Sequence, residues 1–125
     1  MRKKAQMLTR LAKLAEIRSD AELKRFAAFR RHVDALTGQQ DGQRDRMGRL
    51  FAQHEAFSLE GARLASLEAG RLAREIARLD AELDRIRPGF DAARSRAMRE
   101  FGRVRALEQI AEGIRIDARK AAEKR

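Results

Sequence analysis

The chain has 125 residues and a net charge of +10, from 29 Lys and Arg against 19 Asp and Glu, and it contains no Cys, Trp or Tyr. The absence of Cys excludes disulfides, thiolate metal sites and thiol catalysis. Charged residues make up 38% of the chain and apolar residues 43%, and a mixture rich in Ala, Arg, Glu and Leu is typical of long helices and coiled coils. No stretch of the sequence is apolar for the 18 or so residues that a membrane helix needs, so we expect a cytoplasmic protein.

A first helix is predicted over residues of about 3–57, because residues of one heptad phase recur in steps of three and four. Five members of this seam are polar, and we interpret His54 among them as a residue that fixes register. The seam consists of Ala5, Leu8, Ala12, Ala15, Ser19, Glu22, Phe26, Phe29, Val33, Leu36, Gln40, Gln43, Met47, Leu50, His54 and Phe57.

A second helix is predicted over residues of about 62–122. Seventeen of its 18 seam positions are apolar, where the average composition would supply about eight. The seam consists of Ala62, Ala65, Ala69, Leu72, Ile76, Leu79, Leu83, Ile86, Phe90, Ala93, Ala97, Glu100, Val104, Leu107, Ala111, Ile114, Ala118 and Ala121.

The short segment 58–61 between the two seams has a length that suits a turn between antiparallel helices. Folding the chain there places opposite each other residues whose numbers sum to 119, and large residues then face small ones, as dense packing requires. Such pairs include Leu8 with Ala111, Ala12 with Leu107 and Phe26 with Ala93, and the same register places Phe29 opposite Phe90. The sequence therefore predicts one all-α domain over residues 1–125, an elongated antiparallel two-helix coiled-coil hairpin.

Two other places carry turn-forming residues, a Gly-rich segment at 37–45 and Pro88-Gly89. Turns at both would give a three-helix bundle, which is the alternative fold. The heptad phase continues across both places, so we favour the hairpin and interpret Pro88 as a kink in the second helix.

Positive charge is concentrated towards both ends of the chain, with +6 over residues 1–36 and +4 over residues 88–125, against −1 over 37–60 and +1 over 61–87. A hairpin brings both basic segments to one end, where their field would steer an acidic partner. Apolar residues outside the seam lie in the same segments and suggest a partner surface there: Met7, Leu11, Leu14, Ile17, Phe101, Ile110 and Ile116.

The sequence offers no catalytic constellation, cofactor motif or metal site. His32 and His54 lie 22 residues apart without a cluster of further ligands, and there is no phosphate-binding loop or nucleophile elbow. A single seam between two helices also leaves no walls for a deep pocket. We therefore expect a protein that is not an enzyme and carries no cofactor.

The segments Leu72–Leu79, Pro88–Arg94 and Arg99–Glu108, together with the opening Leu8–Arg18, resemble the flagellar export protein FliJ and its YscO-type counterparts in type III injectisomes. The resemblance implies an antiparallel coiled-coil stalk whose end bearing both termini inserts into the hexameric export ATPase ring. It also implies contacts with the export gate and with export chaperones, at the cytoplasmic side of the inner membrane. It does not distinguish a flagellar from an injectisome protein.

On this resemblance, basic and apolar side chains of both helices would contact the ring. The basic ones are Arg2, Lys3, Lys4, Arg10, Lys13, Arg99, Arg103 and Arg105, and the apolar ones are Met7, Leu11, Leu14, Phe101 and Ile110.

Two alternative functions remain open from the residues alone. The 23 Arg and 6 Lys could bind nucleic acid through its phosphates, although no helix-turn-helix is apparent and no Tyr or Trp is present for base stacking. A structural coiled coil with another partner is the second alternative.

Overall fold

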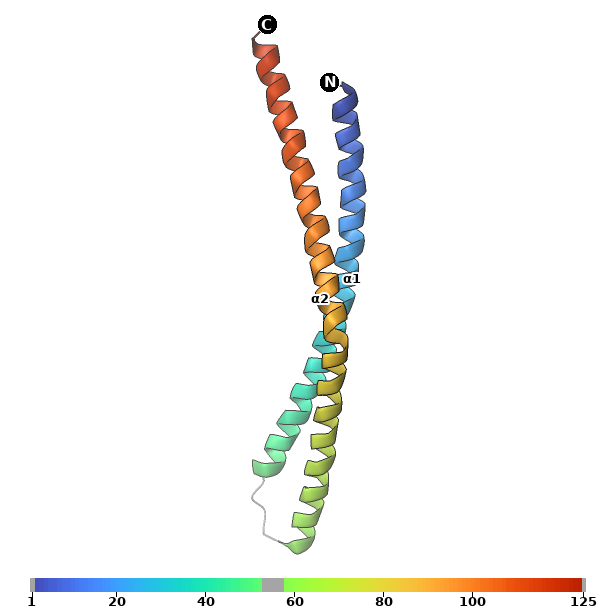
Figure 1. Cartoon of the computed structure of the whole chain (residues 1–125). Coiled ribbons are helices and arrows are strands. Elements are labelled where there is room, and N and C mark those ends of the chain that lie inside the picture. Colours follow the sequence, from blue (N-terminus) through green and yellow to red (C-terminus); the bar gives the residue numbers. More distant parts are fainter. Residues whose placement is uncertain (1, 53–57, 125) are drawn as a thin grey trace. The chain divides into compact units, whose positions relative to one another are not determined.

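The computed structural model describes residues 2–52 and 58–124, which form two helices and no strand (Figure 1). Helix α1 spans Arg2–Ala52 and helix α2 spans Leu59–Glu123. The two helices pack against each other, so the all-α hairpin prediction is confirmed. The three-helix alternative is wrong, because α1 runs unbroken through 37–45 and α2 through 88–89.

The residues that looked like turn signals are accommodated on helical surfaces. A Cβ at Gly38 or Gly42 would meet nothing within 4 Å, so these glycines face open space. Pro88 is also exposed, where water can reach the carbonyl group that lacks its helical partner. A Cβ at Gly89 would lie 3.0 Å from Cε1 of Phe29. Glycine suits this position because the ring of Phe29 packs closely against it.

Helix α2 begins three residues earlier than the predicted start near 62, because Ser58 caps it. The Oγ atom of Ser58 accepts a hydrogen bond from the backbone N–H of Gly61 at 3.0 Å, and its carbonyl accepts one from Ala62 at 2.9 Å. The predicted turn at 58–61 therefore contains the cap and the first turn of α2. Residues 53–57, assigned from sequence to the first helix and including His54 and Phe57, lie outside the described residues.

The chain forms two compact units, and both helices contribute to each. The terminal unit comprises Met1–Ala28 and Asp91–Arg125, and the central unit comprises Phe29–Phe90. Within the terminal unit, the first described turn of α1 and the last of α2 lie at the same end (Figure 1).

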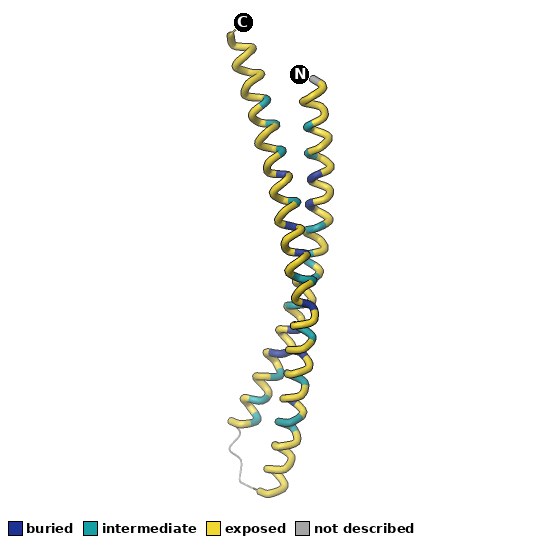
Figure 2. Tube along the Cα trace, viewed as in Figure 1, coloured by how far each residue is buried: buried dark blue, intermediate teal, exposed yellow. Residues whose placement is uncertain are grey.

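Burial follows the two predicted seams along both helices (Figure 2). Every seam residue from Leu8 to Leu50 in α1, and from Ala65 to Ile114 in α2, is buried or half-buried. The heptad assignment is thereby confirmed over these residues.

The two units differ in what their seams bury. In the central unit, Leu36, Leu79 and Ile86 form a buried cluster, with Val33 and Leu83 packed against it. In the terminal unit, the buried apolar residues are small: Ala15, Ala93, Ala97 and Val104. Because stabilisation scales with the apolar area removed from water, the central unit supplies most of the hydrophobic stability.

We predict that Leu79→Ala lowers the free energy of unfolding by about 2–4 kcal/mol, because it leaves a cavity at a side chain with no exposed surface. Leu64→Ala on the same helix is the matched control, since Leu64 is 64% exposed. Urea unfolding followed by circular dichroism measures both. Equal losses for the two variants would contradict the assigned seam.

Candidate protein-docking surface

Nearly all of the net charge belongs to the terminal unit. It holds 18 basic and nine acidic residues, a balance of +9, whereas the central unit holds 11 basic and ten acidic residues, a balance of +1. Each unit is compact on its own, so the net charge is distributed unevenly between the two units. The terminal unit is the one with an electrostatic preference for an acidic partner.

In the central unit, much of the positive charge on α2 is neutralised locally. Three ion pairs recur at intervals of seven residues: Glu68–Arg71, Glu75–Arg78 and Glu82–Arg85. In each pair the guanidinium group donates two hydrogen bonds to the carboxylate, as in Glu68–Arg71 at 2.7 and 3.1 Å. These bonds stabilise the charged form and lower the pKa of each of the three carboxyl groups, so the pairs stay ionised at neutral pH.

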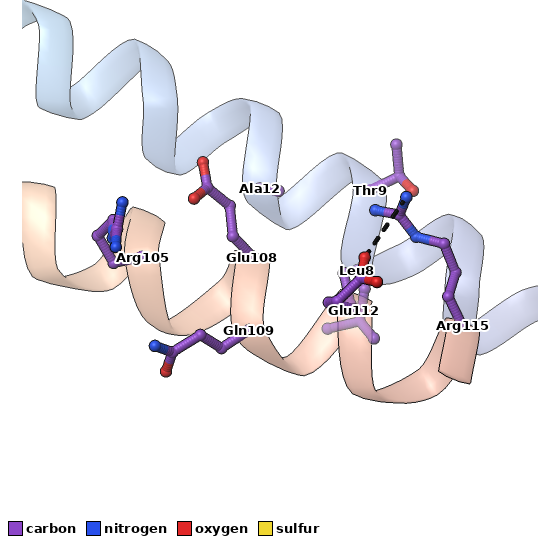
Figure 3. A pocket seen from close by; sticks show the side chains of 9 residues that line it. Leu8, Thr9, Ala12, Arg105, Glu108, Gln109, Glu112 and Arg115 are labelled. Atoms are coloured by element: carbon purple, nitrogen blue, oxygen red, sulfur yellow. Dashed lines mark ion pairs between the residues drawn. The ribbon is translucent and has the colours of Figure 1, made fainter. Parts of the chain in front are cut away.

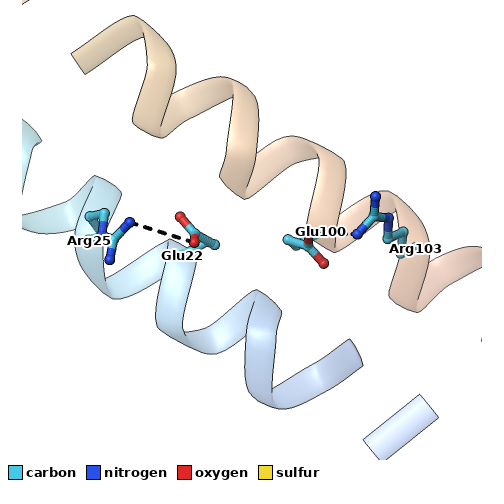
Figure 4. Close-up of polar contacts among 4 residues, drawn as sticks. All are labelled: Glu22, Arg25, Glu100 and Arg103. Carbon is cyan, nitrogen blue, oxygen red and sulfur yellow. Dashed lines mark hydrogen bonds and ion pairs between the residues drawn. The ribbon is translucent and has the colours of Figure 1, made fainter. Parts of the chain in front are cut away.

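The seam of the terminal unit contains a polar layer. Ser19 is buried, and the half-buried carboxylates of Glu22 and Glu100 both lie in the space between the helices (Figure 4). Arg25 pairs with Glu22 at 3.8 Å and Arg103 pairs with Glu100 at 2.9 Å, each from one turn further along the same helix.

The Oε2 atoms of Glu22 and Glu100 are nevertheless buried without a hydrogen-bond partner in the described structure. A buried oxygen without a partner costs free energy. The terminal seam therefore contributes less to the free energy of unfolding than an apolar seam of the same length would.

The residues expected to bind the partner all belong to the terminal unit, and those whose side chains are described are exposed. Arg2 is the first described residue of α1. The structure does not gather these residues into one patch, since they lie on both sides of the seam. In heptad letters, with the seam at a and d, one side carries the g and c positions and the other the e and b positions.

The g side contains a groove of about 410 Å³, which we call the basic groove. It brings together Leu11, Leu14 and Arg103 of the expected set. Its full lining is Leu11, Leu14, Ala15, Arg18, Glu100, Arg103, Ala106 and Leu107.

Further hollows lie on the e side. One lies between Leu23, Phe26, Arg94, Ala97, Met98 and Phe101. Another is shown in Figure 3, where Arg105 of the expected set lines the same hollow as Glu108 and Glu112, and Arg115 pairs with Glu112 at 3.7 Å. Phe101 and Arg105 thus lie on the opposite side of the seam from Leu11 and Leu14.

Arg18, Leu23 and Met98 line these grooves and were not among the residues expected from the sequence. The signal was present, because Arg18 occupies a g position and Leu23 an e position beside the seam, and Met98 occupies a b position on the same side as Leu23. Assigning heptad letters to every residue, and not only to a and d, would have found them.

The described residues contain no group of three or more His, Asp and Glu side chains that could hold a metal ion. No described helix is both long and apolar enough to cross a membrane. What the terminal unit does offer is exposed apolar side chains beside a strongly positive surface, a combination suited to binding another protein.

We predict that Glu100→Leu raises the free energy of unfolding by about 1 kcal/mol, because it replaces a partly buried carboxylate at a seam position with an apolar side chain. Glu108→Leu is the matched control at an exposed position of the same helix, where the change should lie within about 0.5 kcal/mol. Thermal unfolding followed by circular dichroism tests both. Destabilisation by Glu100→Leu would show that the polar layer supports the seam.

No family model, curated protein or solved structure matches this chain.

Proposed function

We propose that the chain is a non-enzymatic coiled-coil component of a flagellar or type III protein export apparatus, whose terminal unit binds the export ATPase ring. The export gate and export chaperones are the further partners that the resemblance to FliJ and YscO-type proteins implies. The observation that carries the proposal is the charge of +9 on the terminal unit against +1 on the central unit.

The energetics of the two units fit this assignment of roles. The central unit holds the chain together through its Leu and Ile core, whereas the terminal unit buries mainly alanines and a polar layer. Nine large apolar residues of the terminal unit lie outside the seam and are exposed: Met7, Leu11, Leu14, Ile17, Leu23, Met98, Phe101, Ile110 and Ile116. A partner that covers those on one side of the seam would supply apolar burial that the terminal seam lacks.

Nucleic acid is the competing partner, because the same positive charge attracts phosphates. Phosphate binding does not explain why so many large apolar side chains of the terminal unit are exposed. The chain also has no Trp or Tyr for stacking on bases. A protein partner accounts for both the charge and the apolar surface.

The test is binding of the purified chain to the export ATPase of the same organism. We predict that replacing Arg96, Arg99 and Arg105 with Glu weakens the complex by at least about tenfold at about 0.1 M salt, because three attractive charges become repulsive. Arg103 is kept, since it pairs with Glu100.

The matched control replaces Arg63, Arg74 and Arg87 with Glu, which changes the net charge equally but on α2 of the central unit. This control should bind like the original chain, and circular dichroism should show both variants equally helical. If the original chain fails to bind the ATPase, or if both variants lose binding equally, the proposal is wrong.

A further inference from the structure

We infer that the basic groove of the terminal unit binds the apolar edge of an acidic amphipathic helix from the protein partner. This inference rests on the protein-docking role proposed above and specifies which side of the terminal unit docks and what it recognises.

The apolar part of the groove comes from both helices. Leu11 and Leu14 stand on α1, 45% and 54% exposed, and Ala106 and Leu107 line the groove from α2. The spacing of three residues places Leu11 and Leu14 one helical turn apart, along the helix axis. An apolar stripe that runs parallel to a helix axis suits a second helix laid alongside it.

The charge around this groove is strongly one-sided. Among residues 3–28 and 91–117, the g and c positions carry six basic residues and one acidic residue, Asp117. The basic ones are Lys4, Arg18, Arg25, Arg96, Arg99 and Arg103. The e and b positions over the same ranges carry four basic and five acidic residues, so the opposite side has no such preference.

Much of the positive charge on the g side is available to a partner. Arg25 and Arg103 pair with Glu22 and Glu100. The other four form no ion pair within the described part of the chain: Lys4, Arg18, Arg96 and Arg99. Acidic side chains that flank an apolar stripe would meet them, which fixes the chemistry of the partner helix as acidic and amphipathic.

A second copy of this chain is a poorer occupant, because pairing two g sides would bring six basic positions of each copy together. Nucleic acid would use the positive charge but would leave Leu11 and Leu14 without a role. The acidic helix uses both features of the groove.

The experiment titrates the full-length chain into a fluorescein-labelled peptide and measures anisotropy. The peptide has about 20 residues with a Leu stripe of heptad spacing and Glu and Ala elsewhere, long enough to form a helix when bound. A scrambled peptide of identical composition controls for charge. We predict that Leu11→Gln with Leu14→Gln weakens binding by at least about tenfold.

The matched control, Leu23→Gln with Met98→Gln, changes two exposed apolar residues of the e side and should bind like the original chain. Arg18→Gln should weaken binding several-fold, because Arg18 lines the basic groove on the g side. Arg94→Gln should leave binding unchanged, because Arg94 lines a hollow on the e side. Equal binding of the scrambled peptide, or equal losses from the two double variants, would overturn the inference. The inference is also wrong if the chain dimerises and the Leu11→Gln, Leu14→Gln variant does not. It is wrong as well if a single-stranded oligonucleotide binds more tightly than the peptide and this variant does not weaken that binding.

The same variants separate this inference from the proposed function. If the original chain binds the export ATPase and Leu11→Gln with Leu14→Gln binds it equally well, the inference is wrong while the proposed function stands. If the chain does not bind the ATPase but binds the peptide in the predicted pattern, the proposed function is wrong and the groove assignment stands.

Discussion

Two helices share only one seam, and this constraint governs the rest of the structure. Residues at a and d positions are the ones that can be buried, so stability depends on which side chains stand there. The central unit places Leu36, Leu79 and Ile86 at these positions, and they form its core. The terminal unit buries Ala15, Ser19 and Val104 there, with Glu22 and Glu100 half-buried, and nine of its large apolar residues are exposed outside the seam. The two units therefore differ in the size of the apolar side chains that they bury and in their net charge.

The charges follow the same division. On the central unit, glutamates at g positions pair with arginines one turn further along α2, so these glutamates neutralise the positive charge of the neighbouring arginines. On the terminal unit, acidic residues are few on the g side, and two of the basic residues there are held by Glu22 and Glu100 of the seam. Exposed leucines and unpaired basic residues therefore lie together around the basic groove. A partner that binds there would gain both apolar burial and ion pairs, which is why we assign the docking role to this unit.

The heptad pattern predicted the fold well. Apolar residues that keep one heptad phase over many turns form a continuous stripe, and this stripe is the face that packs against the other helix. Local signals were poorer guides. The Gly-rich segment and Pro88-Gly89 are typical of turns, yet the seam runs through both, and Gly89 makes room for the ring of Phe29. The cap at Ser58 was missed because Gly61 stands where a capping box would carry Glu or Gln. The expected binding residues were assigned by charge and apolar character alone, which does not say on which side of the seam each one lies.

The docking assignment depends on the register between the helices, because this register places Leu11 and Leu14 beside Arg103 and puts Leu23 and Phe101 on the other side. Disulfide formation tests it most directly in the terminal unit, since the chain has no native Cys. Ala15→Cys would be combined in turn with Val104→Cys, Ala97→Cys and Ala111→Cys, all at buried or half-buried seam positions of α2. We expect a cross-link within one chain for Ala15 with Val104 alone. Cross-linking through Ala97 or Ala111 instead, or only between two chains, would contradict this register.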